Sequence, residues 1–114
     1  MKNKAEIGEN GEHLAKEFLL NKNYNILHCN WRFKRSEIDI IAKDKNTIVF
    51  VEVKARNNSL FGNPEDFVSA NKVKKMREAA EAYIEQFDWK GELRFDIIAI
   101  EKGNKVIHFE DAFY

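Results

Sequence analysis

Apolar residues recur every three to four positions in two segments of the chain, the spacing that places them on one face of an α-helix. The first segment covers about residues 4–21, and its apolar positions are Ile7, Leu14, Ala15, Phe18 and Leu19. The second is expected to begin at Asn63-Pro64, which has the residue types that begin helices. Its apolar positions, which follow a break near Ala70, are Val73, Met76, Ala80, Tyr83, Ile84 and Phe87. The pattern predicts two amphipathic helices.

The remaining apolar positions form short runs that are typical of β-strands. They cover residues 24–31, 37–42, 48–54 and 93–100, and a shorter run covers residues 106–109. Residues 32–36 read as a basic connector between the first two runs, and Asp44-Lys45-Asn46 reads as a tight turn. We expect Tyr24, Ile26 and His28 to share one face of the first strand.

The order of these elements is helix, three strands, helix, and one or two strands. It predicts an α/β domain of the three-layer type, in which a central mixed β-sheet is flanked by helices. The length of 114 residues is near the commonest domain size, so we expect residues 1–114 to form a single domain.

The charge balance limits the kinds of partner that the chain can bind. Lys plus Arg and Asp plus Glu number 19 each, so the formal net charge is zero. Strong non-specific DNA binders usually carry a basic excess. Any phosphate-binding surface must therefore be local.

Cysteine content and hydropathy exclude several other classes of protein. Cys29 is the only cysteine, so an internal disulfide and a cysteine-based metal site within one chain are excluded, and we expect it to be a small buried hydrophobe. The first residues lack the apolar region of a secretion signal, and no apolar run approaches the ~20 residues that span a bilayer. We expect a cytoplasmic protein with no membrane partner.

The most informative feature is acid within two otherwise apolar strands. One reads Glu37-Ile38-Asp39-Ile40-Ile41, and the next reads Phe50-Val51-Glu52-Val53-Lys54. Because side chains two apart share a face, Glu52 and Lys54 point the same way, opposite to their valine neighbours. A carboxylate there is costly to desolvate unless a counter-charge or a cation meets it. Asp39 is the expected companion, and two carboxylates with one ammonium can hold a hard divalent cation.

These residues resemble a known nuclease superfamily. An Asp on the second strand and Glu-x-Lys on the third, in this order of elements, are similar to the PD-(D/E)XK, or restriction-endonuclease-like, proteins. A longer series of motifs resembles the YraN family of uncharacterised bacterial proteins within that superfamily. The series consists of Gly8-x-x-Gly11-Glu12-x-x-Ala15, Asn30-Trp31-Arg32, Glu37-Ile38-Asp39-Ile40-Ile41, Phe50-Val51-Glu52-Val53-Lys54-x-Arg56, Phe61-Gly62, Lys72 and Arg94-Phe95-Asp96.

The resemblance implies an active site as well as a fold. Asp39 and Glu52 match the two metal-binding acids, and Lys54 matches the catalytic lysine. Glu12 matches a helical acid of the Holliday-junction-resolvase-like members, and the Val53 carbonyl is a candidate further ligand. The implied cofactor is Mg²⁺ or Mn²⁺. The sequence departs from the pattern at two places, with Ile38 where the superfamily name has Pro and Ser36 where the family usually has Gly.

Basic residues near these acids are candidate contacts to nucleic acid. Lys72 matches a polar residue on the second helix that often faces phosphate in the superfamily, and Lys75 and Arg56 can share its side. Arg32, in the basic connector, is a fourth candidate.

Each candidate also has a plainer interpretation. Glu52 and Lys54 could form a cross-strand ion pair on a solvated face, which would stabilise little. Glu12 could be a solvated helix residue, and the charge run around Lys72 could be a wet helix face. Asp96 is expected to hold an Arg or Lys structurally.

Two functions fit the sequence. The first is a Mg²⁺-dependent endonuclease that hydrolyses phosphodiester bonds in structured or branched DNA, and the intact Asp39, Glu52 and Lys54 favour it. The second is a non-catalytic nucleic-acid-binding partner protein that retains the nuclease fold, and the zero net charge favours it. A domain this small offers little area to a duplex, so we expect a homodimer, with Ala112-Phe113-Tyr114 as a candidate contact.

Overall fold

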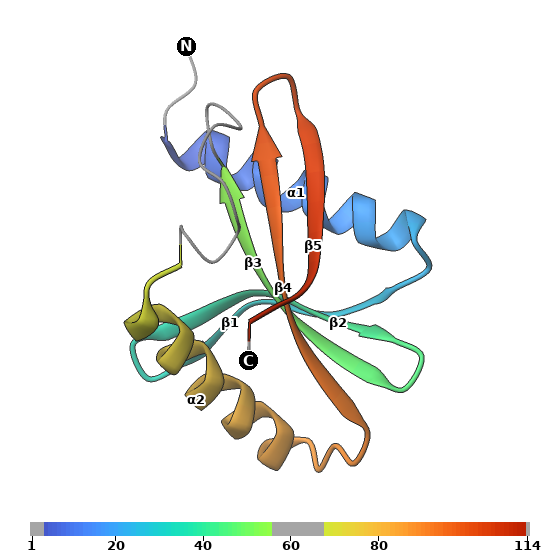
Figure 1. Cartoon of the computed structure of the whole chain (residues 1–114), viewed down its shortest axis with the longest axis vertical. Helices are drawn as coiled ribbons and strands as arrows, with labels where there is room; N and C mark the ends of the chain where they lie inside the picture. The colour runs from blue at the N-terminus through green and yellow to red at the C-terminus, as the bar shows by residue number, and fades with distance from the viewer. Residues whose placement is uncertain (1–3, 56–67, 114) are drawn as a thin grey trace.

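The computed structural model describes the backbone of residues 4–55 and 68–113, with side chains from residue 11 onward (Figure 1). Its elements follow in the order α1 (Lys4–Asn21), β1 (Asn25–Phe33), β2 (Ser36–Asp44), β3 (Thr47–Ala55), α2 (Ala70–Gln86), β4 (Glu92–Glu101) and β5 (Lys105–Phe113). This order confirms the predicted α/β fold class. Across the described residues, none of the helices is both long and apolar enough to pass through a bilayer.

The strands form one sheet of mixed direction, in the order β1-β2-β3-β4-β5. β1, β2 and β3 pair antiparallel, β4 lies parallel to β3, and β5 returns antiparallel to β4. A parallel pair needs a crossover connection, and α2 lies within it. The turn between β2 and β3 is Lys45-Asn46, as the polar pattern predicted, and Lys45 has a φ of 56° there.

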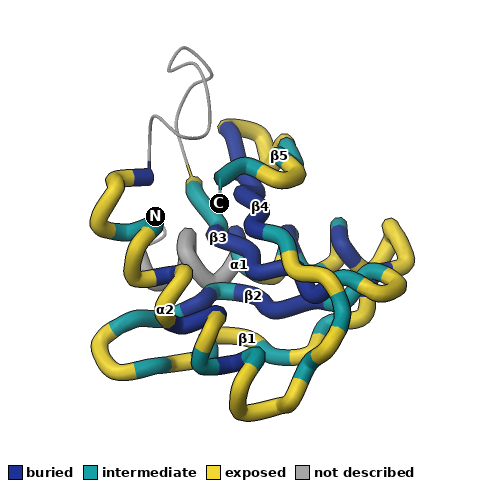
Figure 2. The backbone as a smooth tube through the Cα atoms, turned by 60° about the horizontal axis from the view of Figure 1, so that its bottom comes forward, coloured by how far each residue is buried: buried dark blue, intermediate teal, exposed yellow. Residues whose placement is uncertain are grey.

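One helix packs on each face of this sheet, and Figure 1 shows α1 crossing behind β4 and β5 while α2 lies lower in the view. The core beneath α1 contains Ala15, Leu19, Tyr24, Ile40, Ala42, Val49, Val51, Ile98 and Ile100. The core beneath α2 contains Ile38, Ile41, Ile48, Phe50, Met76, Ala79, Ala80, Tyr83 and Phe95. Because both faces are covered, the middle strands are apolar at nearly every position. Figure 2 shows this as burial concentrated in β2, β3 and β4.

The outer strands are longer than their apolar patterns predicted. The expected basic connector at residues 32–36 is wrong, because Arg32 and Phe33 belong to β1 and Ser36 begins β2. β5 likewise continues to Phe113. Backbone pairing with a neighbouring strand tolerates charged side chains that point to solvent, so polar residues at an edge do not end a strand.

The expectation that Tyr24, Ile26 and His28 share one face is also wrong. Tyr24 and Ile26 pack into the core beneath α1, whereas the His28 ring lies 5.3 Å from the ring of Tyr83 on α2. The β1–β2 register shifts between Ile26 and His28, and a bulge of this kind turns the residues that follow it. Cys29, on this edge strand, is exposed instead of buried.

α2 begins at Ala70 with Ser69 as its N-cap, and the Ser69 hydroxyl accepts a hydrogen bond from the Lys72 N–H over 3.1 Å. Asn63-Pro64, expected to begin this helix, lies outside the described residues, as do Arg56 and Phe61-Gly62. At the other end, Phe87 caps the helix and is 46% exposed. The apolar stripe between these ends faces the sheet, as predicted.

Candidate functional site

β2 and β3 separate at one end of their pairing, and Asp39 lies where they part. Their register runs from Asp44↔Thr47 to Ile40↔Val51, so the next step sets Asp39 opposite Glu52. The Val53 N–H donates a hydrogen bond to Asp39 Oδ2 over 2.8 Å. A side chain therefore joins the two strands beyond the last backbone pair, and its carboxylate is fixed at the fork.

A change of face in β2 explains why Asp39 enters this fork. Ile40 packs beneath α1, but Ile38, two residues earlier, packs beneath α2, so the regular alternation breaks at Asp39. On the neighbouring strand, Asn30 has a φ of 53° and lies between the pairs Cys29↔Ile40 and Trp31↔Ile38. The left-handed conformation, which Asn adopts more readily than most residues, kinks β1 beside the break.

Three carboxylates from two elements meet at this point. Glu12 of α1 and Glu37 and Asp39 of β2 offer oxygen atoms that lie within 4.8 Å of one another. A cation that binds its oxygen ligands at 2.0–2.6 Å can be held between oxygens that lie about 4–5 Å from each other. Glu37 was not among the expected ligands. Its position two residues before Asp39 on one strand is the sequence signal that could have identified it.

Glu52 of β3 is a further acid near this group. It repels Asp39 electrostatically, but its oxygens are not among the three sets that lie within 4.8 Å of one another. Its side chain is 8% exposed, and the Lys72 Nζ of α2 lies 3.6 Å from its Oε2. Among the described residues, this oxygen has no hydrogen-bond partner.

Val51 and Val53 pack beneath α1 whereas Phe50 packs beneath α2, so β3 alternates as its sequence predicts. The charge of Lys54 also acts electrostatically on Glu52.

Burial and crowding disfavour the charged forms of these acids. Burial raises the pKa of Asp39 to about 7, and repulsion from Glu52 and Glu12 adds to the effect. Burial also raises the pKa of Glu52, against the opposing charges of Lys72 and Lys54. A bound cation would favour the charged forms. The positive side chains near these acids therefore do not offset the burial and mutual repulsion of the carboxylates, which is the condition in which a cation would bind favourably.

Some of the expected nucleic-acid-binding residues border these acids. The Arg32 Nε lies 3.2 Å from an oxygen of Glu37, and Lys72 contacts Glu52 as described. Lys75 is exposed, one turn further along α2. Arg56 lies outside the described residues. Val53 contributes its N–H, and its carbonyl as a metal ligand stays a prediction.

Comparison with other proteins places the chain in a family. The profile of the "Uncharacterised protein family UPF0102" matches residues 11–100. The chain belongs to the UPF0102 family. A UPF0102 protein of Christiangramia forsetii is 46% identical over 112 residues, covering 96% of this chain and 94% of the relative. One from Flavobacterium psychrophilum is 47% identical with the same coverage.

UPF0102 is the YraN family, so the expected family membership is confirmed. Among solved structures, SfsA of Pyrococcus furiosus in complex with Ca²⁺ is matched with a TM-score of 0.32 and 15% identity. That match covers 85% of this chain and 58% of the SfsA chain.

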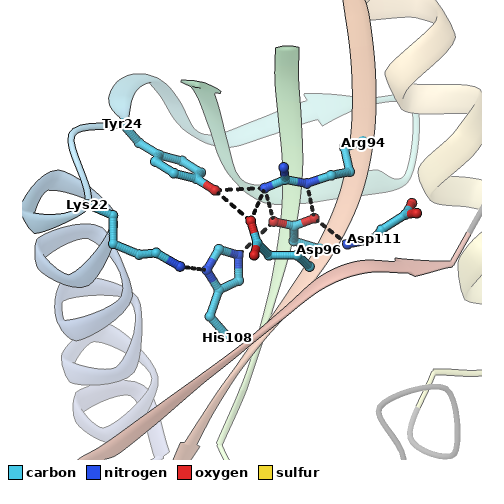
Figure 3. Close-up of polar contacts among 7 residues, drawn as sticks. Lys22, Tyr24, Arg94, Asp96, His108 and Asp111 are labelled. Carbon is cyan, nitrogen blue, oxygen red and sulfur yellow. Dashed lines mark hydrogen bonds and ion pairs between the residues drawn. The ribbon is translucent and has the colours of Figure 1, made fainter. Parts of the chain in front are cut away.

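A second buried acid of this UPF0102 protein, Asp96, has the opposite surroundings (Figure 3). Arg94 Nε and Nη2 each donate to one of its oxygens over 2.8 Å, and His108 Nε2 lies 2.6 Å from Oδ2. The Asp111 N–H adds a bond of 2.9 Å. Burial opposes the charge of Asp96, but the bonds from His108 and Arg94 outweigh it, so its pKa is lowered.

This second cluster is structural. Ligand atoms of Asp96, His108 and Glu110 also lie within 4.8 Å of one another. However, Nη2 of Arg94 is 2.8 Å from Asp96 and 3.2 Å from Glu110, so a metal ion would meet a like charge there. The same nitrogen donates to the Tyr24 hydroxyl over 2.7 Å. The network ties the segment after α1 to β4 and β5, and Asp96 holds an Arg as expected.

Replacing Asp96 should destabilise the fold. Asp96→Asn leaves the Arg94 guanidinium partly buried without its main counter-charge, and removing one partner of a buried pair costs about 3–5 kcal/mol. Urea unfolding at neutral pH measures the loss. As a control, Asp88→Asn removes the partner of Lys90 in an exposed pair and should change little. An Asp96→Asn protein as stable as wild type would contradict the structural role.

Replacing Asp39 should have the opposite effect. Because its pKa is raised in the fold, the folded chain binds more protons than the unfolded chain between the two pKa values, and stability falls as the pH rises through that window. Asp39→Asn keeps an oxygen acceptor for the Val53 N–H but carries no charge. Without metal, we expect it to be more stable than wild type at pH 8 by about 1–3 kcal/mol.

The gain should shrink as the pH falls from about 8 to about 4, where the wild-type carboxyl is protonated in the fold. Urea unfolding in EDTA over this range checks both statements. A variant that is less stable at pH 8, or a difference in stability that does not change with pH, would show that the charged form of Asp39 does not destabilise the fold.

Proposed function

We propose that this UPF0102 protein is a Mg²⁺- or Mn²⁺-dependent endonuclease that acts on structured or branched DNA. One observation carries the proposal. Carboxylates from α1, β2 and β3 converge at the fork of an otherwise apolar sheet, with lysine charge beside them. A protein that needed only stability would gain nothing from this arrangement, since the acids are held against their own repulsion.

The residues fit a hard divalent cation. The donors are carboxylate oxygens, which Mg²⁺ and Mn²⁺ prefer, and Mg²⁺ usually needs few of them because it keeps several waters. Asp39 and Glu12 are the proposed central ligands, with Glu37 and Glu52 on either side. The oxygen of Glu52 that lacks a hydrogen-bond partner among the described residues is the kind of group that a cation or its water satisfies.

The cation and the lysines would have different roles in the reaction. When bound, such a cation lowers the pKa of water and neutralises charge on the phosphate. Lys54, on the same face as Glu52, would orient the attacking water or stabilise the pentacovalent phosphate. Lys72, in the first turn of α2, would meet an adjacent phosphate beside the N–H groups at the helix start.

A second candidate function is a nucleic-acid-binding partner protein without catalysis. The net charge of zero favours it. In either case a homodimer stays part of the proposal. The Phe113 ring lies 5.3 Å from that of Phe95 in its own chain, which favours simple packing over a dimer contact for this residue.

Divalent metal should raise the thermal stability of the wild-type protein. A ligand that binds only the folded state stabilises it by about 2.7 kcal/mol at 100 times its Kd. We expect Mg²⁺ or Mn²⁺ at millimolar concentration to raise the Tm, and the shift to vanish in Asp39→Asn and in Glu52→Gln. Glu17→Gln, which removes an exposed acid of α1, is the matched control and should keep the shift. Equal shifts in all variants would place the metal elsewhere.

Cleavage assays separate the two functions. Single-stranded, duplex, flap and four-way DNA, together with RNA, are incubated with Mg²⁺ and Mn²⁺. We expect Lys54→Ala to fold and bind DNA but not cleave it. We expect Lys72→Ala to bind more weakly, with the salt dependence reduced by about one phosphate contact. Lys90→Ala, in an exposed ion pair, is the control. Binding without cleavage of any substrate would favour the partner protein.

A further inference from the structure

The charges along α2 run against the helix dipole. The cations Lys72, Lys74, Lys75 and Arg77 lie in its N-terminal half, and the acids Glu78, Glu81 and Glu85 lie in its C-terminal half. The first turn has no acid and the last turn has no base. A helix dipole favours the reverse arrangement by about 0.3–1 kcal/mol for each well-placed charge. Helix stability therefore does not explain the distribution. The proposed nuclease uses the basic half and leaves the acidic half without a role.

A largely apolar groove lies beside the acidic half. It has a volume of about 310 Å³ and is lined by Arg77, Ala80, Glu81, Ile84, Glu85, Leu93 and Phe95. The α2 residues among these are spaced as one stripe of a helix, and Leu93 and Phe95 lie on the same face of β4. Leu93 is 47% exposed, so the groove is open at this side. Its size is at the lower end of the roughly 300–1,000 Å³ of ligand pockets.

Among the described residues, no strand pairs with the sheet edge next to this groove. β5 pairs with β4 from Phe95 onward, opposite Phe113. In the described part of the chain, the preceding residues of β4, from Glu92 to Arg94, pair only with β3. An extended segment can add to such an edge and direct alternate side chains to one face. This geometry suits a peptide better than a compact small molecule.

Charge determines which peptide fits. The groove is lined by two exposed acids, Glu81 and Glu85, and by one cation, Arg77, so the acids are in excess and would repel phosphate; nucleic acid is therefore disfavoured. We propose that the groove binds an extended segment of a partner protein in which a bulky apolar side chain stands next to Lys or Arg. The apolar side chain would cover Ile84, Leu93 and Phe95, and the basic neighbour would pair with Glu81 or Glu85.

This groove is separate from the candidate metal site. Lys72, which contacts Glu52, is nine and thirteen residues from the two groove acids, Glu81 and Glu85, on α2. At 1.5 Å per residue, that places these acids roughly 14 and 20 Å from Lys72 along the helix. The two ends can therefore be occupied at once. The proposal does not depend on nuclease activity, and it stands or falls on the peptide measurement alone.

The test selects short random peptides on the immobilised full chain and measures the affinity of the enriched ones by fluorescence anisotropy. We expect enriched peptides to have a bulky apolar residue within two positions of Lys or Arg. Leu93→Glu should weaken binding by roughly tenfold or more, about 1.4 kcal/mol. Leu27→Glu is the matched control, because it places the same charge on another exposed Leu, 38% exposed on β1, and should bind normally.

Charge reversal tests the polarity of the groove. The double variant Glu81→Lys, Glu85→Lys should lose the basic peptides and bind their Glu-substituted versions, whereas Glu78→Lys should not change the preference. All five substituted positions are exposed, and urea unfolding confirms that each variant folds. Enrichment of acidic or purely polar peptides, no enrichment, or unchanged binding by Leu93→Glu would overturn the proposal. Light scattering would also overturn it by showing that the wild-type protein is a dimer and that Leu93→Glu is a monomer, since the groove would then bind a second copy of the chain.

Discussion

The hydrogen bond from the Val53 N–H to the Asp39 carboxylate joins β2 and β3 after their backbone ladder ends. It fixes one carboxylate in the fork, and the other acids approach that carboxylate from different elements. Glu12 comes from the helix on one face, and Glu52 faces the helix on the other. Glu12, Glu37 and Asp39 thus form one group of oxygens between α1 and β2, and Glu52 of β3 acts on Asp39 by electrostatic repulsion. The chemistry proposed for the protein depends on this fork.

Asp39 and Asp96 lie in the same sheet and show how surroundings decide what a buried acid does. Asp96 receives bonds from Arg94, His108 and Asp111, and its pKa is lowered. Asp39 receives one backbone N–H and faces other carboxylates, and its pKa is raised. The first acid strengthens the fold, and the second is available to a ligand. A sequence motif that contains both does not distinguish them, because the partners lie far away in the chain.

The strand periodicity was sufficient to predict the main architecture and part of the site. Alternation along β3 correctly set Glu52 opposite the valines, since β3 is regular. The pattern failed where the backbone departs from regular geometry. The bulge after Ile26 moved His28 to the other face, and the break at Asp39 separated Ile38 from Ile40. Such irregularities arise from strand pairing across the sheet, which one strand's sequence does not contain. Glu37 was missed although it stands two residues before Asp39 on the same strand, and its nearness to Glu12 depends on the fold, which brings α1 beside β2.

The buried network at the end of α1 also sets the rotation of that helix. Tyr24 bonds to Arg94, and the Lys22 ammonium lies 2.9 Å from His108 Nδ1, so the segment that follows α1 is fixed to β4 and β5. Glu12, on α1, lies ten residues before Lys22, which directly follows the helix. Each residue of an α-helix turns the chain by about 100° around its axis. The number of residues between Lys22 and Glu12 therefore determines the direction in which Glu12 points. One residue added or removed in this interval would turn Glu12 away from Asp39, together with those of the α1 core residues Ala15 and Leu19 that precede the change.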